Sequence, residues 1–304
     1  MAVYVNTNYS ALQGQRYLSN VNNSLTTTYQ RLSSGMRINS AKDDAAGLQI
    51  ADRLTSQING LNQGNRNASD GIALAQTIES GMDEISGMLQ KIRTLAVQAS
   101  NGTNTAEDRA ALAKEASSLT AEIARISRQT TYGGKSILAG ATKGAIYSEA
   151  AAGKASQGGK LTLQVGSNKG DTISFDVASF KFSVIAKGFS AGISKKDATA
   201  TKGSAILFST AEAAQNLIAS MDGIIAKVDE QRANLGAIQN RLESSIRNQS
   251  NVAANEADAR SRIRDADFAE ESANLSQQSI IQQAAASMLM QANTRPQLGL
   301  SLLG

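Results

Sequence analysis

Two adjacent carboxylates, Asp43 and Asp44, are the side chains of this sequence whose type and spacing come nearest to a general acid and base. Paired carboxylates can carry such chemistry when their surroundings push their pKa values apart. These two, however, stand where we expect a helix to begin, and a carboxylate at that position is explained by capping and by the helix dipole. We therefore predict no catalytic role for them.

A run of mixed charge at residues 260–271 is the other concentration of groups that could form a site. Its basic and acidic residues recur at spacings of three and four, which bring side chains together on one face of a helix. We interpret the run as an ion-paired joint between the terminal domain of the chain and its outer domain. The expected pairs set Arg260 and Arg264 against Asp267 and Glu271.

The composition excludes most kinds of enzyme. The 304 residues include no His and no Cys, so the chain cannot build a Ser-His-Asp triad, a cysteine nucleophile or a common zinc site. Carboxylate-only and Ser-Lys chemistry stay open. The net charge is only +4, and no cluster of Lys and Arg is interleaved with aromatic residues, which gives nucleic-acid binding little support. We expect no enzyme activity, no cofactor and no metal site.

The sequence also gives no sign of a membrane segment. It has no run of about 20 apolar residues, the length that spans a bilayer. Its first residues, MAVYVNTNYS, lack the basic and apolar regions of a cleavable secretion signal. If the protein leaves the cell, we expect it to use another route.

The two ends of the chain are alike in being nearly free of charge. Residues 1–40 contain no Asp or Glu, and residues 272–304 contain one charged side chain, Arg295. Both ends also have apolar residues at helical spacing, which predicts two amphipathic helices that pack together. The stripes are formed by Leu18, Val21, Leu25 and Leu32 at the first end and by Leu275, Ile281, Ala284 and Met288 at the second.

Between the ends, apolar residues alternate at spacings of four and three over residues 54–96, 112–126 and 217–246. A stripe of this length favours long helices that form a coiled-coil hairpin. Capping patterns divide the helices: Gly35 is a predicted C-cap, and three predicted N-terminal boxes follow. The boxes are Ser40 with Asp43, Thr105 with Asp108, and Ser209 with Glu212.

Residues 141–205 differ in character from the helical segments. Apolar residues alternate from Leu161 to Val165 and from Ile173 to Val177 around a polar, glycine-containing turn, which predicts a β-hairpin. Phe180, Phe182 and Val184 are expected to form a third strand. The predicted fold is thus mainly α, a long coiled-coil helical hairpin rod with a small β insert.

This organisation predicts three domains. Residues 1–40 and 256–304 form a terminal coiled-coil domain, and residues 41–140 and 206–255 form a helical rod domain. Residues 141–205 form the exposed insert. Since the helices lead out and back, the two ends are expected to meet.

Two segments of the sequence resemble a known family. LSSGMRINSAKDDAAGLQIADR, at residues 32–53, and RIRDADFAEESANLSQQSIIQQAAASMLMQAN, at residues 262–293, are similar to the terminal signatures of bacterial flagellin. The resemblance covers roughly residues 1–138 and 209–304. It implies a structural subunit whose terminal helices line the channel of an extracellular filament used for swimming.

The resemblance also implies partners. They are further copies of the chain in a homopolymer, the cap and hook-associated junction proteins, an export chaperone with the type III export apparatus, and the host Toll-like receptor that senses flagellin. The residues that match the receptor motif are Gln90, Lys91, Arg93, Leu95 and Gln98, with Glu115 as a companion. Lys91 replaces the usual Arg and keeps the charge without the bidentate fork, which weakens the expected contact.

Three alternatives stay open from the sequence. A hook-filament junction protein shares the terminal resemblance. A coiled-coil signalling rod, like the cytoplasmic part of a chemoreceptor, would share the long stripes but lacks a β insert between charge-poor ends. The third alternative, an enzyme, is supported by no group of catalytic residues.

In the insert, Thr172, Ser174 and Ser190 are candidate acceptors for O-linked glycans.

Overall fold

The computed structural model of the chain describes residues 7–140, 144–147, 158–186, 206 and 210–301, with side chains as far as residue 294. The chain forms two compact units, one of residues 1–59 and 252–304 and one of residues 60–251. Long helices and two small antiparallel strand pairs confirm the predicted fold class. The division into three domains stays a prediction.

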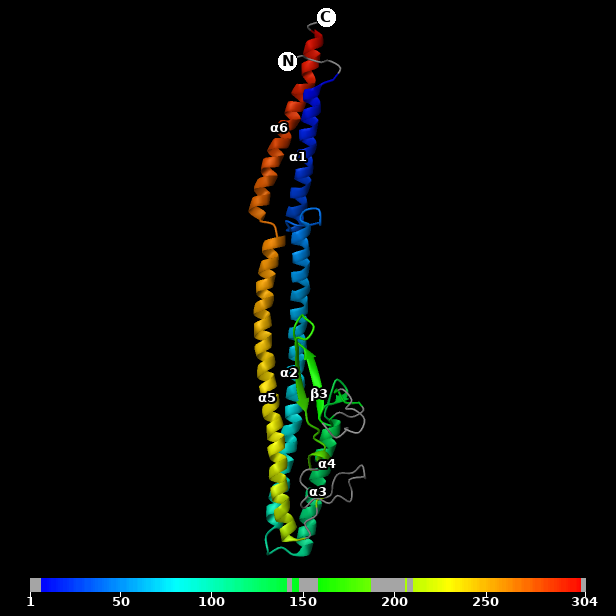
Figure 1. The fold of residues 1–304 in the computed structure, drawn as a ribbon, viewed down its shortest axis with the longest axis vertical. Coiled ribbons are helices and arrows are strands. Elements are labelled where there is room, and N and C mark those ends of the chain that lie inside the picture. The colour runs from blue at the N-terminus through cyan, green and yellow to red at the C-terminus, as the bar shows by residue number, and fades with distance from the viewer. Residues whose placement is uncertain (1–6, 141–143, 148–157, 187–205, 207–209, 302–304) are drawn as a thin grey trace. The chain divides into compact units, whose positions relative to one another are not determined.

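The first unit is built around two helices from opposite ends of the sequence. Helix α1 (Tyr9–Ser34) and helix α6 (Phe268–Ser301) lie side by side and antiparallel (Figure 1). Helix α1 begins at Asn8, whose side chain accepts a hydrogen bond from Ala11 N. It ends at Gly35, where φ is 68°, which confirms the predicted left-handed C-cap.

The second unit contains most of the long antiparallel pair formed by α2 (Ala45–Ala99) and α5 (Ala211–Arg264). The predicted stripes are buried between them, which confirms the heptad-like pattern. The buried residues include Ala75, Ile78, Met82, Ile85, Leu89 and Ile92 on α2 and Leu217, Met221, Ile224, Val228 and Leu235 on α5. Polar pairs flank this core, such as Gln239 Nε2 with Glu79 Oε2 at 3.1 Å and Arg232 with Asp83 at 3.2 Å.

Helix α3 (Ala106–Gln129) follows α2 after a short turn and packs Ala116 and Ile123 into the same core. The predicted capping box is confirmed, with Thr105 and Asp108 each bonding the other's backbone N–H. The Thr105 backbone N–H and hydroxyl, which donate to the carboxylate, lower the pKa of Asp108. At the next predicted cap, Ser209 lies outside the described residues, and Thr210 Oγ1 accepts from Ala213 N at 3.1 Å.

The insert contains the predicted hairpin. Strands β3 (Gly159–Gln164) and β4 (Thr172–Val177) are antiparallel, with Leu161 opposite Phe175. A smaller pair, β1 (Thr131–Tyr132) and β2 (Lys135–Ser136), turns through Gly133 and Gly134 at positive φ.

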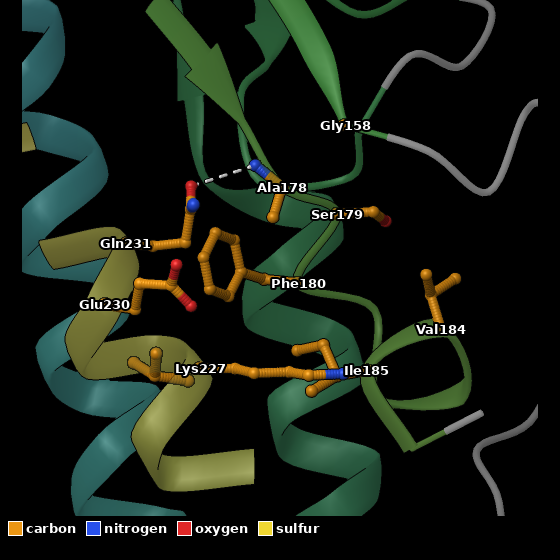
Figure 2. Close-up of a pocket in the computed structure, with 10 residues that line it drawn as sticks. Gly158, Ala178, Ser179, Phe180, Val184, Ile185, Lys227, Glu230 and Gln231 are labelled. Carbon is orange, nitrogen blue, oxygen red and sulfur yellow. Dashed lines mark hydrogen bonds between the residues drawn. The ribbon is translucent and has the colours of Figure 1, made fainter. Parts of the chain in front are cut away.

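The predicted third strand is wrong, because Phe182–Ile185 forms the short helix α4. Beyond the end of β4, the backbone N–H of Phe180 donates to Leu138 O at 2.8 Å and does not pair with a strand. Figure 2 shows the Gln231 side chain of α5 meeting Ala178, whose N–H donates to Gln231 Oε1 at 3.3 Å. The backbone of Ala178 and Phe180 thus bonds groups outside the sheet. The same residues line a surface groove of about 260 Å³.

Glycines on α2 allow the hairpin to approach the helix closely. A Cβ at Gly64 would collide with the backbone carbonyl of Val165, and one at Gly60 would lie 2.7 Å from Ser167 Cβ. At Gly71 the neighbour is only the flexible end of Leu163. Glycine in a helix is otherwise unfavourable, so these positions indicate that backbone contact decides the residue type.

We expect Gly64→Ala to destabilise the second unit by roughly 1–3 kcal/mol, since the added methyl group must displace the Val165 backbone. Urea unfolding followed by circular dichroism measures the change. The matched control is Gly87→Ala on the same helix, where nothing lies within 4 Å of the added Cβ. It should be neutral or should stabilise by about 0.5–1 kcal/mol. Equal effects of the two substitutions would refute the close approach of the hairpin.

Candidate assembly surface

Neutral polar side chains connect α1 and α6. Asn8 Nδ2 donates to Ala292 O at 2.8 Å, and Gln282 Nε2 donates to Asn22 Oδ1 at 2.8 Å. Thr28 Oγ1 donates to Gln278 Oε1 at 3.3 Å. These amide and hydroxyl contacts set the register of the pair without requiring the burial of charge.

One ion pair joins the same two helices near the C-terminal end of α1. Arg31 Nη1 lies 3.1 Å from Glu271 Oε1, and Glu271 is only 7% exposed. A buried carboxylate needs such a partner, because its desolvation is otherwise uncompensated. The sequence did not reveal this pair, since the partners stand 240 positions apart.

The expected pairs within the charged run are therefore wrong. Glu271 bonds Arg31, and Arg260 Nη1 donates to Thr55 Oγ1 at 3.4 Å. Arg262, also in the run, pairs instead with Asp258 of the same helix at 3.0 Å. The physical reason is that helix α5 ends at Arg264, so residues beyond it no longer share a helical face with those before it.

A hydrogen-bonded joint lies where α1 and α5 end. Arg37 N donates to Arg264 O at 2.7 Å, and Ala266 N donates to Gly35 O at 3.0 Å. Met36 and Asp265 thus form an isolated antiparallel bridge. The break at 265–267 was not predicted, although two aspartates in three residues favour capping over helix interior.

Asp43 and Asp44 take part in the turn that precedes α2. Asp43 Oδ2 accepts from Ser40 N at 2.9 Å and from Asn39 N at 3.1 Å, and these donors lower the pKa of Asp43. Asp44 Oδ1 accepts from Gly47 N at 2.9 Å. The predicted capping box is wrong, because the helix begins at Ala45 and Asp44 provides the cap. The structural role expected of both carboxylates agrees with these bonds.

The predicted stripes differ in how well they describe the α1–α6 contact. Leu18, Val21, Leu32 and Leu275 are half-buried, and Leu25 is buried. Ile281, Ala284 and Met288, however, are exposed in the single chain, and their place in the terminal coiled coil stays a prediction. Helix α6 has apolar residues on all sides, and Leu289 is the one that lies against Gly14 of α1.

Large apolar side chains consequently remain uncovered in a single chain. We call this set the exposed terminal face. It consists of Tyr9, Leu12, Tyr17 and Tyr29 on α1 and Ile280, Ile281, Met288 and Met290 on α6. A groove of about 610 Å³ between the helices is bordered by Tyr17 and Met288. Apart from Arg16, no charged side chain occurs between Tyr9 and Gln30, and none occurs from residue 272 to 294.

Within the described ranges, no helix is long and apolar enough to cross a membrane. In the same residues, His, Cys, Asp and Glu form no group of three that could hold a metal ion.

The residues that match the receptor motif lie in the second unit. Gln90, Lys91, Gln98 and Glu115 are exposed, and Lys91 Nζ lies 3.9 Å from Glu115 Oε1. Arg93 Nε donates to Asp222 Oδ1 at 2.5 Å, and this bond raises the pKa of Arg93. Leu95 is only 6% exposed and belongs to the core. The structure brings Lys91 and Glu115 together, while the receptor contact stays a prediction.

The candidate glycan acceptors lie on the insert. Thr172 and Ser174 are exposed on β4, and Ser190 lies outside the described residues. Their modification stays a prediction.

Comparison with known proteins identifies both helical ends. Residues 5–143 match the model of the bacterial flagellin N-terminal helical region, and residues 218–303 match that of the C-terminal helical region. Flagellin B of Vibrio cholerae is 35% identical, and flagellin A of Vibrio anguillarum is 36% identical, each over 100% of both chains. The crystal structure of Bacillus cereus flagellin is 25% identical, with a TM-score of 0.46, covering 60% of this chain and 88% of that one.

We expect Arg31→Ala to speed amide hydrogen exchange in α6, because it leaves the Glu271 carboxylate buried without its partner. A loss of about 1–3 kcal/mol corresponds to exchange roughly 5–150 times faster where local opening limits the rate. Mass spectrometry of peptides from residues 268–292 measures the rate.

Arg262→Ala is the matched control, because Asp258 and Arg262 are both exposed. A surface pair of this kind contributes only about 0–1 kcal/mol. If both substitutions changed exchange equally, the Arg31–Glu271 pair would have no special role.

Proposed function

The chain belongs to the bacterial flagellin family and is a subunit of the flagellar filament, and we propose that its copies join through the exposed terminal face. The alternative of a hook-filament junction protein is not favoured, since the matches over the whole chain are to flagellins. The family is one of structural proteins. Its members form the extracellular filament of the flagellum.

The observation that carries the proposal is the distribution of apolar residues around α6. A helix with apolar residues on all sides leaves some of them exposed to water unless more than one neighbour covers it. Here α1 covers one side, with Leu289 against Gly14, and leaves Ile280, Met288 and Met290 exposed. Further copies of the chain can supply the missing cover.

The absence of charge on this surface supports the same proposal. Each charged side chain in a repeated interface would have to be desolvated in every copy, at a cost of several kcal/mol unless it were paired. Residues 272–294 contain no charged side chain. The one acidic residue of α6 that is buried, Glu271, already has Arg31 as its partner within the chain.

A filament further requires contacts between unlike surfaces. When one patch binds a different patch on the next copy and the rotation does not close, the product is an open helical polymer. Helices α1 and α6 expose different side chains, mainly tyrosines on α1 and, apart from Phe268, isoleucines and methionines on α6. Two such faces suit head-to-tail association.

We expect Ala284→Lys to raise the critical concentration for polymerisation at least about tenfold, which corresponds to about 1.4 kcal/mol per contact. Ala284 is exposed, so the lysine is accommodated in a single chain and becomes costly only when a neighbour covers it. Sedimentation of filaments grown from seeds measures the concentration.

The control is Thr162→Lys, which adds the same charge at an exposed position of β3 in the other unit. It should polymerise like the parent chain. Normal polymerisation of the Ala284→Lys protein would exclude this part of α6 from the interface.

Recognition by the innate flagellin receptor is proposed as a further property. The exposed side chains of Gln90, Lys91 and Gln98 follow one another along α2, and Glu115 lies within 3.9 Å of Lys91. Leu95 is unsuitable as a probe, because its truncation would open a cavity in the core.

Gln98→Ala should lower receptor signalling by monomers roughly tenfold, and Lys91→Arg should raise it, because the guanidinium can bond two acceptors at once. A reporter cell line measures both responses. Gln76→Ala, at another exposed glutamine of α2, is the matched control. Signalling that is unchanged in the Gln98 and Lys91 variants would rule out this surface.

The remaining partners are proposed on the same physical ground. At the end of a filament the exposed terminal face has no further copy to cover it, so cap and junction proteins are suitable partners there. Before assembly an export chaperone could cover it, on the way to the type III apparatus. Glycans on Thr172 and Ser174 would lie on the insert, away from the charge-poor helices in sequence; intact-mass measurement of native filaments tests this modification.

A further inference from the structure

We infer that Met288 and Met290 form an oxidation-sensitive site at which conversion of the thioethers to sulfoxides blocks assembly. The two side chains are 67% and 66% exposed on α6. The effect on assembly rests on the proposed function, whereas the selectivity of oxidation does not.

Methionine is the most readily oxidised residue type that this chain contains. The chain contains no Cys, no Trp and no His, and it has seven Met residues. Oxidation follows access to the sulfur. Met82 and Met221 are 0% exposed in the core of the second unit, and Met36 and Met88 are half-buried. Among the described methionines, Met288 and Met290 are therefore the ones that a dissolved oxidant reaches most freely.

The geometry of α6 places the two sulfurs on opposite flanks of the contact with α1. Successive residues of an α-helix are about 100° apart, so Met288 and Met290 stand on either side of Leu289. Leu289 faces Gly14 of α1. A neighbour that covers either flank of α6 therefore covers one of these two side chains.

The chemistry is a two-electron oxygen transfer. The thioether sulfur attacks one oxygen of hydrogen peroxide, an S–O bond forms as the O–O bond breaks, and the departing oxygen leaves as water after proton transfer. The sulfur is oxidised and the peroxide is reduced. A flexible apolar side chain thus becomes a polar one with a strong acceptor, in a segment without charges that could bond it. Once filaments form, their covered thioethers should be protected.

The test treats the full-length chain, before assembly, with dilute hydrogen peroxide and maps sulfoxides by peptide mass spectrometry. We expect oxidation at Met288 and Met290 to be at least about tenfold faster than at Met82 and Met221. The oxidised protein should show a critical concentration raised at least about tenfold, and methionine sulfoxide reductases should restore assembly.

A double substitution, Met288→Leu with Met290→Leu, separates the effect of oxidation at this site from oxidation elsewhere, because leucine has a similar volume and does not react with peroxide. The comparison is made within this variant, treated against untreated, so that an effect of the substitutions themselves on assembly cancels, and its critical concentration should change less than about twofold on treatment. Equal loss of assembly in the treated variant, or oxidation of Met82 and Met221 at the same rate as Met288 and Met290, would overturn the inference. Failure of reductases to rescue the wild-type chain would also overturn it. If the untreated wild-type chain does not assemble, the proposed function fails. The peptide map still shows whether Met288 and Met290 are oxidised faster than Met82 and Met221.

Discussion

Helix α6 has more apolar surface than one neighbouring helix can cover, and much of the molecule is arranged around that constraint. Its contact with α1 uses Leu289 and a series of amide and hydroxyl bonds. Met288 and Met290 stay exposed. An exposed apolar surface of this kind marks a contact site, and we propose that further copies of the chain cover it.

The distribution of charge follows from the same constraint. The first unit keeps its buried carboxylate, Glu271, beside Arg31, where both partners belong to one chain and no neighbour is needed for neutralisation. The second unit is different, since α2, α3 and α5 bury their own stripes and carry ion pairs such as Arg93 with Asp222 at the edges. The second unit buries its apolar core within the chain, and on our proposal association with other copies covers the apolar surface of the first.

The sequence predicted the features that depend on local periodicity or capping. The stripes of α2 and α5, the box at Thr105 and Asp108, the Gly35 cap and the β3–β4 hairpin are all confirmed. It failed where distant residues decide the outcome. Arg31 bonds Glu271 across the chain, and α4 replaces a strand because Phe180 bonds Leu138. On α6, a helix apolar on every side offered no single stripe from which the side facing α1 could be read.

Whether neighbouring copies cover the exposed terminal face can be measured by cryo-electron microscopy of filaments grown from this chain, through the exposed fraction of each side chain in the assembled state. We expect Ile280, Ile281, Met288 and Met290 all to be buried against other copies. An intact filament in which these side chains still face solvent would contradict this expectation.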